Sequence, residues 1–110
     1  MDCIFCKIIN KQMPASIVYE DEDVIAFKDI HPAAPTHMLF VPKKHVGRLD
    51  DLSPDQTQII NNIYSSILSF VNLHGLKESG FKVQVNVGKG GGQVVFHLHF
   101  HLLSNKKLEL

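Results

Sequence analysis

Three histidines alternate with apolar residues near the end of the sequence, in the run His97-Leu98-His99-Phe100-His101-Leu102-Leu103. Side chains of a strand alternate between its two faces, so an extended run would place the three imidazoles on one face, about 6.6 Å apart. Imidazoles at this spacing suit two kinds of site. They can converge on one zinc ion, or one imidazole can attack a substrate while its neighbours orient it and transfer protons.

A glycine-rich segment, Gly88-Lys89-Gly90-Gly91-Gly92, precedes the histidines and is followed by Gln93. Consecutive backbone N–H groups without obstructing side chains are typical of an anion-binding nest, and the amide of Gln93 adds a donor. This segment favours a phosphate-bearing substrate over a bare metal ion. A glycine-rich hairpin turn is the alternative, because the spacing matches neither a P-loop nor the dinucleotide-binding fingerprint.

The composition argues against a partner selected by bulk charge. The 110 residues include 11 Lys and Arg, 11 Asp and Glu and 7 His, which gives a net charge of 0 with neutral histidines. Nucleic-acid polymers and membranes select a basic excess or a basic run, and the sequence has neither, so we expect neither as a partner. The length predicts one domain over residues 1–110. Charges at the N-terminus exclude a signal-peptide core or a membrane span there, so the expected location is cytoplasmic.

The pair Cys3 and Cys6 has the spacing of half a zinc site. In a reducing compartment these residues are thiols or metal ligands in preference to a structural disulfide. A thioredoxin-like redox pair would follow a strand, whereas almost nothing precedes Cys3. Two small buried thiols are the remaining interpretation.

Hydrophobic patterning predicts an α+β fold with a mainly antiparallel sheet, because helices and strands are segregated along the chain. A short helix is expected over residues 3–10, ended by Met13-Pro14. The acidic turn at residues 21–23 joins the first two strands as a hairpin. The five expected strands are Ile17–Glu20, Val24–Lys28, Met38–Val41, Phe81–Val87 and Val94–Leu103.

A long helix is the clearest predicted element. Ser53-Pro54-Asp55-Gln56 supplies an N-cap, a proline at the first helical position and a capping-box partner, and His74-Gly75 ends the helix. Its apolar residues cover an arc of roughly 180°, although about 100° suffices for packing on one sheet. The surplus width predicts self-association; a helix embedded deeply between sheet and loops is the alternative.

These motifs together resemble the histidine triad (HIT) family, and its Hint-like branch most closely. The resemblance covers nearly the whole chain and is specific because its segments occur in the family's order. The segments are Cys3-Ile4-Phe5-Cys6-Lys7-Ile8-Ile9, Ala26-Phe27-Lys28-Asp29-Ile30, Pro35-Thr36-His37, Val41-Pro42-Lys43-Lys44-His45, Gly91-Gly92-Gln93 and the triad itself.

The resemblance implies a HIT-like fold: a five-stranded, mainly antiparallel sheet with one long helix and a short N-terminal helix, two such sheets being joined in a homodimer. It implies hydrolysis of the P–N bond of purine nucleoside 5′-phosphoramidates through a covalent nucleotidyl-histidine intermediate, with no cofactor for catalysis. Rival functions are a diadenosine polyphosphate hydrolase of the same family, a hydrolase using the triad as zinc ligands, and a non-catalytic nucleotide-binding adaptor.

Site residues are carried over by motif position. His99 is the expected nucleophile, and His97, His101 and His37 are expected to orient it and relay protons. The substrate-binding residues expected from the resemblance are Asn86, Gly92 and Gln93 near the phosphate, Asp29 on the ribose hydroxyls, and Phe27 and Ile30 beside the base.

The cysteine pair has a counterpart in zinc-binding members of the family. By position, the ligands of one structural zinc ion would be Cys3, Cys6, His45 and His97. The chain departs from the branch at Val94, where many members carry a hydroxyl directed at the scissile bond, and in its tail after Leu103. Because of both departures, the preferred leaving group and the preferred substrate are expected to differ from those of other members.

Overall fold

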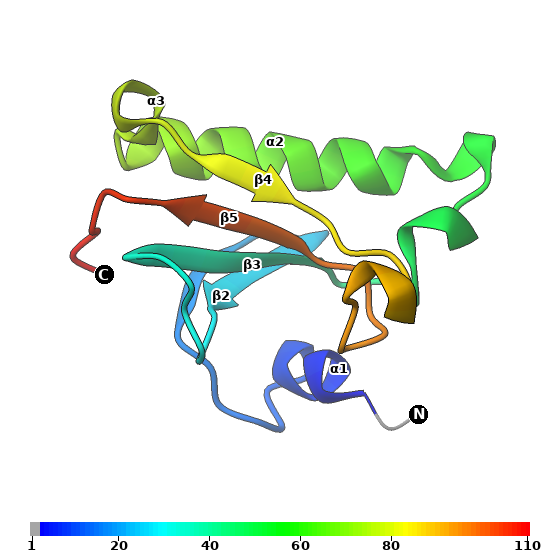
Figure 1. Ribbon diagram of the computed structural model, residues 1–110. Coiled ribbons are helices and arrows are strands. Elements are labelled where there is room, and N and C mark those ends of the chain that lie inside the picture. The colour runs from blue at the N-terminus through cyan, green and yellow to red at the C-terminus, as the bar shows by residue number, and fades with distance from the viewer. Residues whose placement is uncertain (1–2) are drawn as a thin grey trace.

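The computed structural model describes residues 3–110, which form a five-stranded sheet between one long and one short helix (Figure 1). The strand order is β1-β2-β3-β5-β4, with every neighbouring pair antiparallel. The α+β class, the five antiparallel strands and both predicted helices are therefore confirmed. The helices are α1 (Ile4–Ile9), α2 (Gln58–Leu73) and α3 (Leu76–Ser79), and the strands are β1 (Ile17–Glu20), β2 (Val24–Lys28), β3 (Thr36–Pro42), β4 (Lys82–Gln84) and β5 (Phe100–Ser104).

The predicted β1–β2 hairpin is confirmed, and Asp21 closes its turn. The Asp21 carboxylate accepts the backbone N–H groups of Asp23 and Val24, both at 2.8 Å. This local bonding is the reason why a short acidic segment folds as a turn. Strand β3 extends beyond the predicted Met38–Val41 at both ends.

Strands β2 and β3 are buried on both faces, because each face packs against a different helix (Figure 1). Val24 and Ala26 face the α2 side, whereas Ile25 and Phe27 face α1. The alternation of strand side chains thus divides the interior into two apolar clusters. The cluster on the α1 side also contains Phe5. The Phe5 ring packs against the ring of His97 in the histidine run.

Helix α2 begins later than the sequence predicts. Residues Pro54–Gln56 form a separate 3-10 turn, in which the Gln56 side chain accepts the Ser53 N–H at 3.0 Å, and α2 begins at Gln58. The capping signal is therefore used by the turn that precedes the helix. The predicted end is confirmed: the N–H of His74 bonds to Phe70, and Gly75 has a φ of 67°.

The two last strands are shorter than predicted, which corrects Phe81–Val87 and Val94–Leu103. Residues 94–99 form no regular strand, and within them the Leu98 N–H donates to the carbonyl of Val46, in the loop after β3, at 2.6 Å. Leu98 still packs in the α2 cluster, and His97 still lies against α1. Leu98 and His97 therefore still lie on opposite faces of the sheet, although this segment is not a strand.

Among residues 3–110, no helix is long and apolar enough to span a membrane.

Candidate active site and metal centre

A cavity of about 520 Å³ lies over the α1 side of the sheet, at the histidine run. One wall comes from α1 and from the chain after β2, and the other from β4, the glycine-rich segment and the triad. The lining residues are Ile4, Phe5, Lys28, Asp29, Ile30, His31, Leu39, Gln84, Asn86, Gly92, Val94, Val95, His99 and His101.

The structure brings six of the predicted catalytic and substrate-binding residues together in this cavity. They are His99, His101, Asp29, Ile30, Asn86 and Gly92. The other four lie behind its surface: His37, Phe27, Gln93 and His97. Phe27 is 3% exposed and contacts the lining through Phe5, with ring centroids 5.4 Å apart.

His99 has a defined proton position. It is 8% exposed, and its Nδ1 lies 2.7 Å from the carbonyl oxygen of His97. A carbonyl only accepts, so Nδ1 carries the proton and the neutral ring keeps a lone pair on Nε2. Burial lowers the pKa of His99, which favours this neutral form. The ring therefore presents a nucleophilic nitrogen at the cavity.

His37 and His101 form a hydrogen-bonded pair beside the cavity. The N–H of Ala33 donates to His37 Nδ1 at 3.0 Å, so neutral His37 carries its proton on Nε2. That proton is donated to His101 Nδ1 at 2.9 Å, which leaves the His101 proton on Nε2. An Asp29 carboxylate oxygen lies 3.4 Å from His37 Nε2. Burial, together with His99 and His37, lowers the pKa of His101 to about 4.

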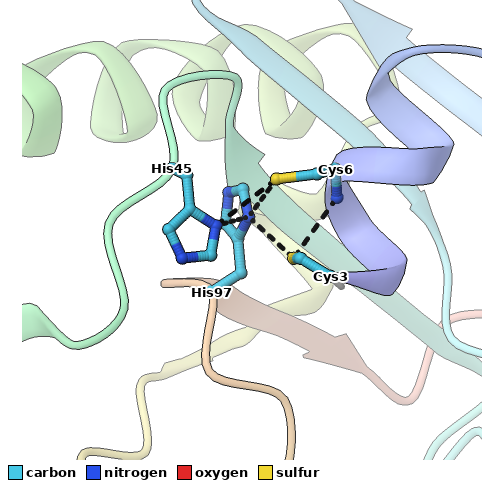
Figure 2. Close-up of side chains that lie close together, drawn as sticks. All are labelled: Cys3, Cys6, His45 and His97. Atoms are coloured by element: carbon cyan, nitrogen blue, oxygen red, sulfur yellow. Dashed lines mark hydrogen bonds between the residues drawn. The ribbon is translucent and has the colours of Figure 1, made fainter. Parts of the chain in front are cut away.

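His97 is turned away from the cavity and joins the cysteines (Figure 2). Its Nε2–H donates to the carbonyl of Pro42 at 2.8 Å, so its Nδ1 lone pair faces Cys3, Cys6 and His45. Burial lowers the pKa of His97 to about 4. Toward the cavity, His97 acts through its backbone carbonyl, which holds the ring of His99.

The cluster of Cys3, Cys6, His45 and His97 brings four potential metal-ligand atoms within 4.8 Å of one another (Figure 2). Four separations between the ligand atoms are 3.4, 3.3, 3.6 and 3.1 Å. Zinc with sulfur at about 2.3 Å and nitrogen at about 2.0–2.1 Å separates neighbouring ligand atoms by about 3.3–3.8 Å. Both cysteines are free thiols, so two sulfurs and two imidazole nitrogens fit this ion with shifts of a few tenths of an ångström.

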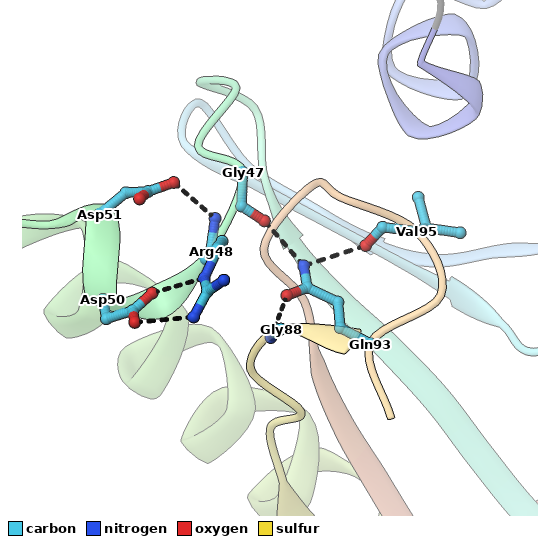
Figure 3. A network of polar contacts seen from close by, with 7 residues as sticks. All are labelled: Gly47, Arg48, Asp50, Asp51, Gly88, Gln93 and Val95. Atoms are coloured by element: carbon cyan, nitrogen blue, oxygen red, sulfur yellow. Dashed lines mark hydrogen bonds and ion pairs between the residues drawn. The ribbon is translucent and has the colours of Figure 1, made fainter. Parts of the chain in front are cut away.

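Gln93 is a structural centre of the glycine-rich segment (Figure 3). Its amide oxygen accepts the Gly88 N–H at 2.9 Å, and its amide nitrogen donates to the carbonyls of Gly47 and Val95 at 2.7 and 3.1 Å. The side chain is 6% exposed, so its bonds join the segment to the loop after β3. A direct contact of Gln93 with phosphate stays a prediction.

The predicted nest of free N–H groups in this segment is wrong in part. The N–H groups of Gly91, Gly92 and Gln93 donate to carbonyls within the segment, because residues Lys89–Gly91 form a 3-10 turn. Asn86 donates its side-chain N–H to Gly91 O at 2.8 Å, which holds the turn against the cavity. The segment therefore positions Asn86 and Gly92 instead of offering a run of free donors.

Eight lining residues lie outside the predicted catalytic and substrate-binding set: Ile4, Phe5, Lys28, His31, Leu39, Gln84, Val94 and Val95. Phe5 contacts the His99 ring edge to face, with centroids 5.1 Å apart, and Lys28 and Val95 complete the walls. The position of Phe5 between two candidate metal ligands could have indicated from the sequence that it lies near the site. No sequence pattern indicates Val95, because its position depends on the irregular path of residues 94–99.

Comparisons with known proteins agree with this geometry. A family model described as "Scavenger mRNA decapping enzyme C-term binding" matches residues 2–109. The chain is 36% identical over 107 residues to the purine nucleoside phosphoramidase of Escherichia coli K12, covering 97% of this chain and 90% of that protein.

Solved structures give the same relationship. A histidine triad protein from Clostridium difficile superposes with a TM-score of 0.93 at 46% identity, covering 100% of this chain and 96% of that one. A Zn-bound histidine triad family protein from Mycobacterium smegmatis has a TM-score of 0.79 at 32% identity, covering 99% of this chain and 78% of that one. With the alternating histidines at the cavity and these relatives, the chain belongs to the histidine triad (HIT) family of hydrolases.

Proposed function

We propose that the protein hydrolyses the P–N bond of purine nucleoside 5′-phosphoramidates through a nucleotidyl-histidine intermediate. The observation that carries this proposal is the His99 ring, whose Nδ1–H is held by a carbonyl while its Nε2 lone pair is available at the cavity. The E. coli relative is named a purine nucleoside phosphoramidase, which supports the same reaction.

In the first step, His99 Nε2 attacks phosphorus and forms an N–P bond. The P–N bond to the amine breaks, its electron pair stays on the amine nitrogen, and that nitrogen takes the Nε2 proton of His101. His101 reacts here as the imidazolium, which the neighbouring anionic phosphate favours, and it becomes neutral. In the second step, water attacks phosphorus, the electron pair of the N–P bond returns to His99, and His101 regains a proton from the water. The contact between His37 Nε2 and His101 Nδ1 orients the His101 ring so that its other nitrogen, Nε2, is the one that exchanges protons with the amine and the water.

The cavity offers a purine nucleotide both apolar and polar contacts. Ile4, Phe5 and Ile30 supply apolar surface for the base, and the carboxylate of Asp29 accepts ribose hydroxyls. Asn86 lies on the opposite wall, where its amide contacts the phosphate. Val94 is 89% exposed at the rim, so the leaving group meets a methyl surface there instead of a hydroxyl.

The test compares wild type with His99→Ala on a fluorogenic adenosine phosphoramidate. We expect His99→Ala to lose turnover by at least about 10³-fold, because no nucleophile replaces the imidazole. His74→Ala, at the far end of α2, is the control for loss of one histidine. Wild-type turnover in His99→Ala would refute the mechanism. A wild-type protein that binds AMP without turnover would be an adaptor, and one that prefers diadenosine polyphosphates would be the other hydrolase type.

We further propose that Cys3, Cys6, His45 and His97 hold one structural zinc ion, for which the ligand geometry and the Zn-bound M. smegmatis relative are the support. When bound, zinc cross-links α1 to the sheet and supplies no group to the reaction.

Because the thiols must stay reduced to serve as ligands, we propose a cytoplasmic location.

We also propose a homodimer. Tyr64 and Leu68 on α2 are 58% and 38% exposed, and Val83 on the edge strand β4 is 43% exposed. Strand β4 is an edge of the sheet, because it pairs only with β5. An open edge strand together with an exposed apolar helix face favours pairing with a second copy, which would join two sheets.

A further inference from the structure

Helix α1 carries metal ligands and cavity wall on consecutive residues. Cys3 and Cys6 belong to the metal cluster, whereas Ile4 and Phe5, between them, line the active-site cavity. The Cys3 sulfur also accepts the N–H of Cys6 at 3.4 Å, which caps the helix at its first turn. The ligands and the wall therefore share one turn of backbone and cannot shift independently.

Phe5 connects the two sites through its ring. It is 6% exposed and packs edge to face against His99, with centroids 5.1 Å apart and an interplanar angle of 87°. The same ring lies 6.0 Å from the ring of the metal ligand His97. Edge-to-face aromatic contacts have a preferred geometry, so a displaced Phe5 would leave the His99 ring without its packing partner.

His97 provides a second connection. Its Nδ1 points into the metal cluster, and its carbonyl accepts the His99 Nδ1–H at 2.7 Å. A change in the His97 position on metal loss would alter the same ring that Phe5 contacts. Both connections lead from the metal cluster to the cavity.

We propose that metal and nucleotide bind cooperatively, with Phe5 as the positioning residue that carries the coupling. Metal bound to Cys3 and Cys6 holds the first turn of α1, and the turn holds Ile4 and Phe5 in place as the wall against the base and His99. This inference rests on the proposed function, since it requires the cavity to be the nucleotide site. Coupling between two ligands is reciprocal, so each raises the affinity of the other by the same factor.

The experiment measures this factor in both directions on the full chain. Calorimetry gives the Kd of AMP for zinc-loaded and for chelator-stripped protein, and competition with a chromophoric chelator gives the Kd of zinc with and without saturating AMP. We expect both ratios to be equal and at least about fivefold. Equal AMP affinity in the two forms would overturn this inference alone. Absence of AMP binding in both forms would overturn the proposed function as well.

Phe5→Leu tests the route of the coupling. This variant keeps all four metal ligands, so we expect its Kd for zinc in the absence of AMP to equal that of wild type. We expect saturating AMP to leave this Kd unchanged, which gives a ratio near one. Ile8→Val is the matched control: Ile8 is also 6% exposed on α1 but does not line the cavity, so we expect the wild-type ratio. If Phe5→Leu retained the wild-type ratio, Phe5 would not be the coupling residue.

Discussion

At the scale of single residues, the histidines differ in which nitrogen carries the proton. The carbonyl of His97 holds the proton of His99 on Nδ1, whereas the carbonyl of Pro42 holds that of His97 on Nε2. The lone pairs therefore point in different directions, one toward the cavity and one toward the cysteines. His97 and His99 look equivalent in the alternating run, but their hydrogen-bond acceptors leave a different ring nitrogen of each free to react or to bind a metal.

His101 makes stability depend on pH. Its pKa is lowered to about 4 by burial first and by His99 and His37, whereas an exposed histidine in the unfolded chain has a pKa of about 6.5. Between these values the unfolded chain binds more protons, so the free energy of unfolding rises with pH and levels off above about 6.5. We expect His101→Gln to lose less stability than wild type between pH 7 and pH 5, measured by urea denaturation in chelator.

The chelator removes bound metal from both proteins, so the comparison isolates His101. His31→Gln, which changes an exposed histidine, is the matched control and should keep the wild-type pH dependence. An identical slope in His101→Gln and wild type would contradict the assignment.

At the scale of elements, the segment at residues 88–93 is joined to the loop after β3 by the Gln93 side chain, which donates to the carbonyl of Gly47 (Figure 3). Arg48 pairs with Asp50 at 2.8 and 2.9 Å, and its guanidinium lies where a β-carbon on Gly88 would approach it to 3.1 Å. Gly88 has φ 72° and ψ 170°, a region essentially restricted to glycine. Gly88 therefore lies next to the Arg48 guanidinium, and its N–H is held by the amide oxygen of Gln93.

Gly88→Ala should lower the free energy of unfolding by about 1–3 kcal/mol, because both the backbone angle and the contact with Arg48 oppose a β-carbon. Chemical denaturation measures the change. Gly90→Ala is the control in the same segment: nothing lies within 4 Å of its added β-carbon, and we expect stability within about 0.5 kcal/mol of wild type. Equal effects of the two substitutions would show that Gly88 is not constrained.

Helix α1 is short, and the proposed metal is its cross-link to the sheet. We expect chelation to lower the free energy of unfolding by about 2.7 kcal/mol or more when free zinc had exceeded its Kd 100-fold, since zinc stabilises only the state with a formed site. Thermal denaturation with and without chelator measures this loss, and zinc added back should restore stability. Cys6→Ser should contain well below one zinc per chain by elemental analysis and should not respond to the chelator; full zinc content would refute this ligand.

At the scale of the whole molecule, the two faces of the sheet differ: one packs the larger part of the core, and the other carries the candidate site. The α2 face forms the larger apolar cluster, and the α1 face carries the cavity and the metal cluster. Two apolar side chains within the arc of α2, Tyr64 and Leu68, remain exposed. These exposed side chains belong to the wide apolar arc of α2, which is why we expect self-association through this helix.

Leu68→Glu should convert the proposed dimer into a monomer, because a buried unpaired carboxylate is costly at an apolar interface. Light scattering at micromolar concentration measures the mass. Leu73→Glu is the matched control: Leu73 is 78% exposed on the same helix but lies outside the arc of Tyr64 and Leu68. A wild-type monomer would refute the dimer, and loss of association in both variants would refute this interface.

The sequence alone determined the class of fold, the order of the elements and the candidate side chains of the site, because periodicity, turn residues and the spacing of histidines are local properties of the chain. The resemblance assigned His97 to the metal ligands and His99 to the attack on phosphorus, but only the tertiary structure shows which nitrogen of each ring carries the proton. The acceptors that decide this, the carbonyl of Pro42 for His97 and the carbonyl of His97 for His99, are placed by the fold. The place of Gln93 and the contact of Phe5 with His99 likewise depend on segments far apart in the chain, whose approach no local pattern encodes.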